Sequence, residues 1–588
     1  MKTLRAVDAV IVGGGWAGLL MAKELGARTQ LSVVVLERGE PHTPGAADYA
    51  AGMDELDYVT RSRLMQDYSR ETVTLRHAPG DRAIPIRQLG SFLPGTGVGG
   101  AGEHWGALFP RYVPDLFELR TKTIERYGAE KLPADHSIQD WGITWEEIEP
   151  YYAKAEQLVG VSGQTGNLNG KKIEGGNIFE GPRSTDYPMA PLKIASLPAL
   201  FRDAAKSLGY HPYPNAAAVN SKAYKNSDGL SRPGCFYCGF CDHYGCMIAA
   251  KSQPSNTLLP IVAKQKGVTI RTNTSVRRII ADSEKTNAKV RGVSYIDSSG
   301  EEVFQPADIV FVATWTFNNT RLLLLSNLGE PYDPATGKGT LGKNLTHQIQ
   351  FGVQAFFDKP LNRFMGAGGV GVRMSDFDGD AFDHSQLPFL RGGIFYATST
   401  GAQPIASFGV VPRAVKSHWG SEWKKAAIEC YDRTGTVTFA GEHIAYKSNF
   451  MGLDPTYKDH LGDPLLCLTL DWNNNERKMA EFAAPKAVEL VKAMGGKDVI
   501  PFSGYVRYDA TRYQSTHVQG GTIMSASPET GVLNPYSQHW QYSNLFVLGA
   551  SAFPQQGAAN PTPTILALTL RTADAIVDRY IKSPGSVL

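Results

Sequence analysis

Four cysteines crowd into one short segment, and thiols at this spacing can bind a metal together. The segment PGCFYCGFCDHYGCMIAAKS has the spacing C-x2-C-x2-C-x4-C, formed by Cys235, Cys238, Cys241 and Cys246. Disulfides between such close cysteines would close small, strained loops. Zinc is an alternative because thiolates suit it, but structural zinc sites usually draw ligands from two separated pairs. Tight runs of thiolates typically enclose one compact iron–sulfur cluster, so the spacing favours a cluster over zinc. Cys430 and Cys467 are isolated and are expected to be packed thiols.

A second group of residues, near the N-terminus, predicts dinucleotide binding. The pattern G-x-G-x-x-G is formed by Gly13, Gly15 and Gly18. Glycines here permit a tight turn and the close approach of a pyrophosphate, and a following helix offers free N–H groups and the positive end of its dipole. An acid about 20 residues further on can hold a ribose hydroxyl pair. Glu37 stands at about that distance.

The elements that would position these glycines are also indicated. Val7–Val12 is typical of a buried strand, Trp16–Leu25 of a helix, and Ser32–Leu36 of a second strand. This order of strand, glycine turn, helix, strand and acid distinguishes a dinucleotide site from an ordinary glycine-rich turn.

A second glycine-rich stretch, GSFLPGTGVGGAGEHWG, covers residues 90–106. Its many glycines indicate backbone packed against something flat or charged. A solvated spacer is the alternative, but Phe92, His104 and Trp105 in the same stretch argue against it.

The overall composition is that of an ordinary globular protein. The chain has 588 residues, of which 42% are hydrophobic and 20% charged, and its net charge is +2. This balance calls for neither nucleic acid nor an anionic membrane. No apolar stretch approaches the length of a transmembrane helix, and the opening apolar run is too short for a secretory signal. We therefore expect no transmembrane segment of its own, no nucleic-acid partner, and membrane contact only through a partner.

Several segments spread along the chain resemble the glucose–methanol–choline (GMC) oxidoreductases. They are VDAVIVGGGWAGLLMAKEL with VVVLERG near the N-terminus, DWGITWEEIEPYYAKAEQLVGVSG (140–163), ADIVFVATWTFNNTRLLLLS (307–326), LGKNLTHQ (341–348) and NLFVLGASAFPQQGAANPTPTILAL (544–568). The resemblance implies an α/β (α+β) fold with a Rossmann-like FAD-binding domain and a sheet-based substrate-binding domain. It assigns 1–110, 230–345 and 510–588 to the first, and 111–229 and 346–509 to the second. We expect the helix-rich segment Trp141–Val159 at their junction.

The cofactor implied by the resemblance is FAD. The positions implied to contact it are Gly13, Gly15, Trp16, Gly18, Glu37, Gly97, Gly100, His104, Val276, Ala313, Ala550, Asn560 and Thr562. His104 stands in AGEHWG, which resembles the segment through which some relatives attach FAD covalently to a histidine. A non-covalent histidine beside the flavin is the alternative.

Two residues near the C-terminus match the family's catalytic contexts. His517 lies in STHVQGGTIM and Asn560 in AANPTPTI. A neutral imidazole is a natural base near physiological pH. The resemblance implies that His517 takes the hydroxyl proton and that Asn560 donates to the substrate oxygen. A carboxylate substrate would also need a cation, for which Arg512, His347 and His539 are candidates without a geometric argument.

The cysteine segment resembles that of the large, flavin-bearing subunit of bacterial membrane-linked sugar and sugar-acid dehydrogenases. Its YCGFC spelling, the glycine-rich stretch and FELRTKTIERYG look most like the gluconate 2-dehydrogenase group. Related glucose and fructose dehydrogenases use three cysteines for a 3Fe–4S cluster, which implies Cys235, Cys241 and Cys246, with Cys238 spare. The last gap is x4 here rather than x3, so a 4Fe–4S cluster on all four stays open.

The resemblance implies an enzyme that oxidises a secondary alcohol, D-gluconate to 2-keto-D-gluconate, with hydride transfer to the flavin. Electrons would leave through the iron–sulfur cluster to a membrane-bound multihaem cytochrome c subunit. A small subunit would carry the export signal, and the location would be periplasmic. The alternatives are a dehydrogenase for 2-ketogluconate, glucose, fructose or sorbitol, an oxygen-using GMC oxidase with a zinc-stabilised loop, and a non-enzymatic electron-transfer subunit.

Overall fold

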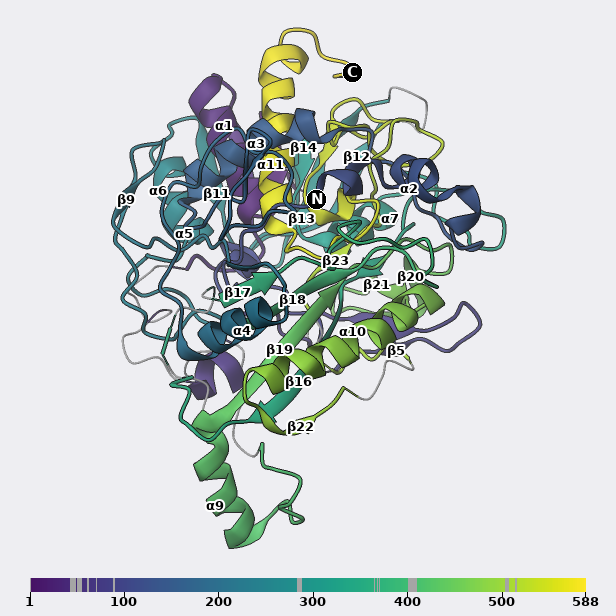
Figure 1. Ribbon diagram of the computed structural model, residues 1–588. Helices are drawn as coiled ribbons and strands as arrows, with labels where there is room; N and C mark the ends of the chain where they lie inside the picture. The colour runs from purple at the N-terminus through teal and green to yellow at the C-terminus, as the bar shows by residue number, and fades with distance from the viewer. Residues whose placement is uncertain are drawn as a thin grey trace.

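Two large β-sheets, with helices packed on them, form the body of the molecule (Figure 1). The computed structural model describes residues 2–588 apart from 43–48, 50–54, 61–62, 70, 88–89, 283–287, 364, 367–368, 370, 400–404, 406–409, 503–506 and 513–514. All of the sequence-predicted site residues lie within the described part of the chain. The mixed helix and strand content confirms the predicted fold class.

The first sheet has eight strands. Their order is β11–β3–β2–β14–β13–β12, and β1 and β24 also pair with β14. The bounds are β1 Lys2–Thr3, β2 Val7–Val12, β3 Val33–Leu36, β11 Val268–Arg271, β12 Ser275–Ala281, β13 Val290–Ile296, β14 Glu302–Val312 and β24 Leu545–Val547. Strands β11, β3, β2, β14 and β24 run parallel. The valine-rich runs of β2 and β3 suit this arrangement, because parallel strands are covered by other elements on both faces.

The N-terminal strand–helix–strand unit confirms the prediction with small shifts. Strand β2 has the predicted bounds, and helix α1 spans Trp16–Arg28, past the predicted end at Leu25. Strand β3 begins at Val33 rather than Ser32, because the Ser32 side chain and amide bond to Asp8 instead.

The second large sheet is antiparallel and has the order β22–β16–β19–β18–β17–β8. Its bounds are β8 Pro212–Pro214, β16 Ile349–Phe356, β17 Gly371–Met374, β18 Gly393–Thr398, β19 Thr434–Gly441 and β22 Lys497–Ile500. Helices α4 (Ser196–Ser207) and α10 (Asn474–Ala493) cover one face. That face is apolar, with a row formed by Phe395, Phe439 and Phe351 in adjacent strands. The opposite face carries the polar side chains described below.

Smaller elements complete the fold. A four-stranded sheet has the order β20 (Phe450–Lys458), β21 (Pro464–Thr469), β4 (Val73–Arg76) and β5 (Ile84–Pro85). The two-stranded pairs are β6 (Asn167–Leu168) with β7 (Lys171–Lys172), β9 (Tyr224–Lys225) with β10 (Ser231–Arg232), and β15 (Thr346–His347) with β23 (Val518–Gln519). Further helices are α2 Leu119–Tyr127, α5 Pro254–Thr257, α6 Leu259–Val262, α7 Thr316–Leu325 and α9 Gly420–Cys430. Short helical turns include η3 Gly100–Gly102 and η7 Ala550–Ala552.

Helix α3, Trp145–Val159, packs along α11, Thr562–Ala575. The helix predicted near 141–159 is therefore present but begins at Trp145. A capping box fixes this start, since Thr144 and Glu147 each bond the backbone of the other.

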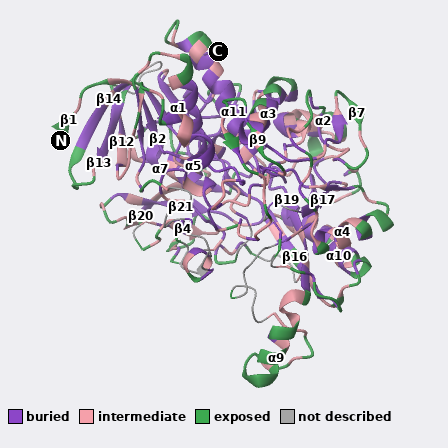
Figure 2. Cartoon of the chain, turned by 90° about the vertical axis from the view of Figure 1, so that its left-hand side faces the viewer, coloured by how far each residue is buried: buried purple, intermediate pink, exposed green. Residues whose placement is uncertain are grey.

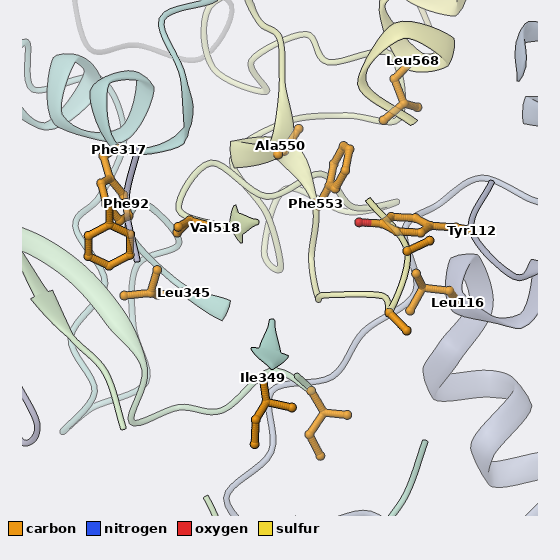
Figure 3. Packing of buried hydrophobic residues seen from close by; sticks show 14 of the residues in the cluster. Phe92, Tyr112, Leu116, Phe317, Leu345, Ile349, Val518, Ala550, Phe553 and Leu568 are labelled. Carbon is orange, nitrogen blue, oxygen red and sulfur yellow. The ribbon is translucent and has the colours of Figure 1, made fainter. Parts of the chain in front are cut away.

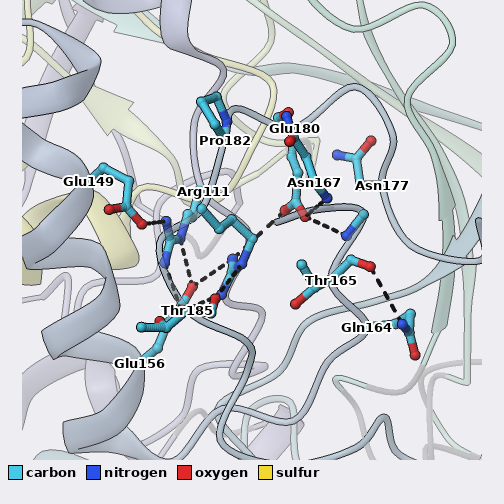
Figure 4. A network of polar contacts seen from close by, with 12 residues as sticks. Arg111, Glu149, Glu156, Gln164, Thr165, Asn167, Asn177, Glu180, Pro182 and Thr185 are labelled. Carbon is cyan, nitrogen blue, oxygen red and sulfur yellow. Dashed lines mark hydrogen bonds and ion pairs between the residues drawn. The ribbon is translucent and has the colours of Figure 1, made fainter. Parts of the chain in front are cut away.

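Two carboxylates of α3 anchor a buried polar network (Figure 4). The guanidinium of Arg111 contacts Glu149 at 2.7 Å and Glu156 at 2.8 Å, and that of Arg183 contacts Glu156 at 2.6 Å. All four side chains are at most 9% exposed. Losing one partner would leave an uncompensated buried charge, so the network holds the chain around Arg111 against α3.

Burial follows these layers: the strands of both large sheets are mostly buried, whereas α9 projects away from the body (Figure 2). A cluster of aromatic and aliphatic side chains lies beside the candidate site (Figure 3). In it, Phe92 packs on Phe317 with ring centroids 5.0 Å apart, and Val518 and Ala550 are buried nearby. Among the helices that the structure describes, none combines the length and the apolar character needed to cross a bilayer.

Candidate active site and cofactor cradle

The turn after β2 packs so closely that only glycine fits at two of its positions. Gly13 has φ +100°, and a Cβ there would lie 2.5 Å from the carbonyl oxygen of Ala313. A Cβ on Gly18 would lie 2.0 Å from the carbonyl oxygen of Gly13. These glycines let α1 approach the sheet and place Ala313, at the end of β14, beside the turn.

Gly15 differs from its neighbours because it faces open space. The nearest atom to a Cβ on Gly15 would be the Gly99 oxygen at 3.9 Å, and for Gly100 it would be the Gly15 Cα at 3.7 Å. No side chain caps the start of α1, and its first turn has no acid. Free N–H groups at a helix start, beside bare backbone, form a site for an anion such as a pyrophosphate. We call Gly15, Gly99 and Gly100 the glycine cradle.

Glu37 directly follows β3 and lies against the same turn. Its carboxylate accepts hydrogen bonds from the amides of Gly14 at 2.8 Å and Gly39 at 3.0 Å. Its backbone oxygen accepts from the Thr274 amide at 3.0 Å, just before Val276 in β12. The carboxylate thus lies at the edge of the parallel strands, and half-buried Val276 follows Thr274 by two residues.

The second glycine-rich stretch lies against the cradle. Gly97 and Gly99 have positive φ, and the Gly99 amide bonds to the Gly14 oxygen at 2.8 Å. Two buried polar atoms here have no hydrogen-bond partner, the indole nitrogen of Trp16 and Nε2 of His104. Burial lowers the pKa of His104 to about 3, so its imidazole is neutral. Unpartnered buried nitrogens at this place fit a bound group such as a flavin.

His517 and Asn560 lie in contact, although 43 residues separate them. His517 directly precedes β23, whose antiparallel pairing with β15 matches His347 with Val518. Continuing this register places Gln348 opposite His517, and the Gln348 oxygen lies 2.6 Å from Nδ1 of the imidazole. Asn560 directly precedes the residue that caps α11, and its amide nitrogen lies 2.9 Å from Nε2.

The hydrogen bonds around this pair define which imidazole nitrogen carries the proton. The Gln348 amide group donates to the Ala558 carbonyl, so its oxygen faces Nδ1 of His517. The guanidinium of Arg373 donates to the Asn560 oxygen at 2.8 Å, so the Asn560 NH₂ faces Nε2. Nδ1 is therefore the donor, and the lone pair of Nε2 is directed toward Asn560.

Burial, together with smaller charge repulsion from His347 and Arg373, lowers the pKa of His517 to about 3. The imidazole is consequently neutral at physiological pH, which is the form that accepts a proton. Asn560 and His517 are both half-buried, so the pair stays partly accessible.

The C-terminal cofactor positions converge on the same place. The Ala550 oxygen accepts from the Gly520 amide at 3.1 Å, three residues after His517. Thr562 opens α11 two residues after Asn560. The bare glycine cradle, the acid at the strand edge and the unpartnered His104 together fit an FAD.

The three candidates for a substrate cation do not supply one. The side chain of Arg512 is 82% exposed and pairs with Asp509. His347 is buried between Tyr508 and the Ser515 oxygen, and burial lowers its pKa to about 4. His539 accepts a backbone amide from Gln541, and burial also lowers its pKa to about 4. Sequence reasoning did not assign Gln348 or Arg373, because neither stands near His517 in the chain.

Within the described part of the chain, none of the four cysteines of the segment forms a disulfide. Cys241 and Cys246 are buried, whereas Cys235 and Cys238 are half-buried. Backbone amides donate to the sulfurs of Cys235 at 3.3 Å and Cys246 at 3.4 Å. Within the described part of the chain, however, no three His, Cys, Asp or Glu side chains converge on a common metal position. The thiols as placed therefore do not fit a cluster.

One buried ammonium joins the cysteine segment to the glycine-rich stretch. Lys251 Nζ donates to the carbonyls of Glu103 (3.3 Å), Trp105 (2.9 Å), Cys241 (2.8 Å) and Tyr244 (2.7 Å). Lys251 is 1% exposed. Its carbonyl partners flank His104 on one side and belong to the cysteine segment on the other.

Comparisons with known proteins match this arrangement. The family described as GMC oxidoreductase matches residues 134–350 and 445–569. The gluconate 2-dehydrogenase flavoprotein of Pantoea cypripedii is 41% identical over 594 residues, covering 100% of this chain and 96% of that protein. The fructose dehydrogenase large subunit of Gluconobacter japonicus is 27% identical, covering 98% of each. A solved structure of a formate oxidase variant from Aspergillus oryzae has the same fold, with a TM-score of 0.63 at 15% identity and 99% coverage of both chains.

Proposed function

The chain belongs to the GMC oxidoreductase family, and from this we propose that it oxidises the C2 alcohol of a sugar acid, D-gluconate, to 2-keto-D-gluconate with FAD. The substrate is suggested by the similarity of the whole chain to a gluconate 2-dehydrogenase flavoprotein. The observation that carries the chemistry is the contact of His517 with Asn560, since a proton acceptor and an amide donor stand side by side.

The residues of this chain supply the acid–base half of the reaction. Nε2 of His517 accepts the proton of the substrate hydroxyl, and the Asn560 NH₂ donates to the same oxygen and stabilises the developing alkoxide. Bound FAD supplies the acceptor for the hydride of the carbinol carbon. Gln348 keeps the proton of His517 on Nδ1, so the Nε2 lone pair, which faces the Asn560 NH₂ in this structure, acts as base when Asn560 donates to the substrate oxygen instead.

FAD would be held at the cradle, the Glu37 carboxylate and the C-terminal positions. We extend the proposal to a covalent bond at His104, with a non-covalent contact as its alternative. Acid precipitation separates them, since covalent flavin stays with the protein and adds the mass of FAD to the chain. The proposed FAD-binding domain comprises 1–110, 230–345 and 510–588, and the proposed substrate-binding domain the two segments between them.

The proposal also includes an iron–sulfur cluster on Cys235, Cys238, Cys241 and Cys246. The presence of four cysteines within one segment favours the cluster, but among the described residues their side chains do not converge on one metal position, so no step of the mechanism depends on it. Iron and acid-labile sulfide measured on the purified protein, normalised to flavin, decide the matter. Zinc without sulfide would instead support the zinc-stabilised loop.

The setting of the enzyme is proposed from its relatives, which are named as a flavoprotein and as a large subunit. We propose a small subunit that carries the export signal, a membrane-bound multihaem cytochrome c subunit as electron acceptor, and a periplasmic location. Cell fractionation and co-purification of c-type haem test these points together.

The substrate is tested by dye reduction with gluconate, 2-ketogluconate, glucose, fructose and sorbitol. Gluconate is expected to give the highest kcat/KM. The fructose dehydrogenase relative is the reason to include neutral sugars. Peroxide formation in air at the rate of turnover would instead identify an oxygen-using oxidase.

Replacing the proposed base tests the mechanism. His517→Ala is expected to lower the rate of substrate-dependent flavin reduction by about 10²- to 10⁴-fold, because general base catalysis is worth that much. FAD content should be unchanged. His539→Asn is the matched control, since asparagine can keep the acceptor that His539 offers to the Gln541 amide. Rapid-mixing absorbance measures both variants, and equal rates in His517→Ala and wild type would refute the assignment.

A further inference from the structure

Arg373 is a buried guanidinium that forms no ion pair within the described part of the chain. It lies in β17 and is 4% exposed. Other buried arginines, such as Arg111, Arg183 and Arg391, form ion pairs with carboxylates. Among the residues that the structure describes, no carboxylate lies within 4.0 Å of Arg373, and its hydrogen bond goes to Asn560. The buried carboxyl of Asp378 acts on Arg373 by charge attraction over a longer distance. Burial of an unpaired charge is costly, so such a group calls for an anion.

The position of Arg373 in the sheet places it on the face turned toward the catalytic pair. Strand register matches Arg373 with Tyr213 in β8 and with Tyr396 in β18. Tyr396 is in turn matched with Thr438 in β19. Directly opposite residues of antiparallel strands share a face. This face is therefore polar, and we call the row Tyr213, Arg373, Tyr396 and Thr438 the polar row.

The polar row is not fully closed. Tyr396 and Thr438 are half-buried, as are His517 and Asn560. The Arg373 guanidinium carbon lies 5.6 Å from the centroid of the Tyr396 ring, so the ring supports the guanidinium from one side. A substrate in contact with His517 and Asn560 would thus be bordered by the Arg373 side chain.

The spacing suits a 2-hydroxy acid. In such a substrate the carboxylate is bonded directly to the carbon that carries the reacting hydroxyl. Arg373 bonds Asn560 at 2.8 Å, and Asn560 bonds His517 at 2.9 Å. Only the Asn560 side chain therefore separates the guanidinium from His517. A substrate whose carboxylate and reacting hydroxyl lie on adjacent carbons could contact both residues at once. A guanidinium binds a carboxylate through two parallel hydrogen bonds, which also fixes its orientation.

We propose that Arg373 binds the carboxylate of the substrate and thereby selects sugar acids over neutral sugars. This proposal rests on the proposed oxidation of a sugar acid and names the residue that determines its specificity. Arg373 also holds the Asn560 amide, so a purely positioning role is the competing explanation. The two roles differ in one respect, because only carboxylate binding depends on the charge of the substrate.

The decisive comparison uses D-gluconate and its neutral isostere D-gluconamide. Arg373→Gln should lower kcat/KM for gluconate by about 10- to 100-fold, chiefly through KM, as expected for the loss of hydrogen bonds to a charged group. The value for gluconamide should change several-fold less. Arg373→Lys should restore part of the preference for gluconate. Asn560→Ala is the matched control, and it should lower both substrates alike.

A binding measurement keeps this inference separate from the proposed reaction. The holoenzyme is titrated with 2-deoxy-D-gluconate, which has the carboxylate but no reacting hydroxyl, and the flavin absorbance is followed. Wild type should bind it about 10- to 100-fold more tightly than Arg373→Gln does. If wild type binds the analogue but does not oxidise gluconate, and Arg373→Gln loses the binding, the proposed reaction is wrong and the anion site stands. Turnover of gluconate with equal losses for gluconate and gluconamide in Arg373→Gln would overturn the inference and leave the reaction standing.

Discussion

His517 is held by two amides whose own orientations are fixed by further hydrogen bonds. Gln348 is oriented by the Ala558 carbonyl, and Asn560 by Arg373. The proton of the imidazole is thus assigned to Nδ1 by residues that do not react themselves. This is a positioning role for Gln348, because it acts through His517.

A charge change at Gln348 tests that role. Gln348→Glu would place a carboxylate beside Nδ1, and an adjacent opposite charge favours the protonated imidazole. We expect the pKa of His517 to rise and the acid limb of kcat/KM to move to higher pH by about one unit or more. The pH profile of flavin reduction measures this. Gln354→Glu, in the strand β16 that follows Gln348, is the control, and an equal shift there would contradict the assignment.

The sequence indicated His517 and Asn560, because each stands in a recognisable local context, and the structure places them in contact. Their roles stay predictions. The sequence did not indicate Gln348 and Arg373, because their contacts with the catalytic pair depend on which strands pair over long distances in the chain. Arg512 was considered for its closeness to His517 in the chain, but its side chain points into solvent.

At the scale of elements, Gly15 faces open space and Gly18 is closely packed, so substitutions at these two positions should have different effects. Gly15→Ala meets no atom closer than 3.9 Å, so the fold should persist while the added methyl occupies the cradle. We expect FAD affinity to fall by about tenfold or more, because a buried contact of this kind is worth about 1.4 kcal/mol or more. Gly80→Ala has open space around its Cβ and serves as control.

Gly18→Ala should instead disturb folding, since its Cβ would overlap the Gly13 oxygen. Flavin titration of the apoprotein and thermal unfolding distinguish the two effects. If Gly15→Ala lowered the unfolding temperature of the apoprotein as much as Gly18→Ala, a cofactor-specific role for Gly15 would be wrong.

The N-terminal unit could be predicted closely because its strands and helix follow one another and carry strong local signals. The antiparallel sheet could not be ordered in advance. It joins β8 to β17 and β16 to β22 across more than a hundred residues, and period-two patterns do not identify which strands pair.

For the whole molecule, the buried histidines predict acid sensitivity. Burial lowers the pKa to about 3 or 4 for His104, His347, His384, His443, His517 and His539. The unfolded chain takes up protons on these groups below about pH 6.5, whereas the folded chain does not. The free energy of unfolding should therefore fall as pH drops from 6.5 toward 4.

Buried carboxyls act in the opposite direction, and burial raises the pKa of Glu103, Glu180 and Asp380 as well as those of the three that follow. Burial raises the pKa of Glu442 and Glu476 to about 8 and that of Asp378 to about 7. Their contribution is present in acid and is lost as pH rises through these values. The histidine contribution should lower the unfolding temperature below pH 6, with the carboxyls offsetting part of that fall, and the carboxyls should lower it above neutral pH. Calorimetry from pH 5 to 8 checks this. In His539→Asn the fall in unfolding temperature at acid pH should be smaller than in wild type. A midpoint that rises toward pH 5 would contradict it.

The four carbonyls that bind Lys251 couple the glycine-rich stretch around His104 to the cysteine segment. If the backbone beside His104 or the loop of Cys241 and Tyr244 moved away, the buried ammonium of Lys251 would lose two of its carbonyl acceptors and gain no water in their place. Oxidation of the thiols, or the binding of an inorganic centre to them, would therefore also shift the backbone on each side of His104, because both segments are bonded to Lys251.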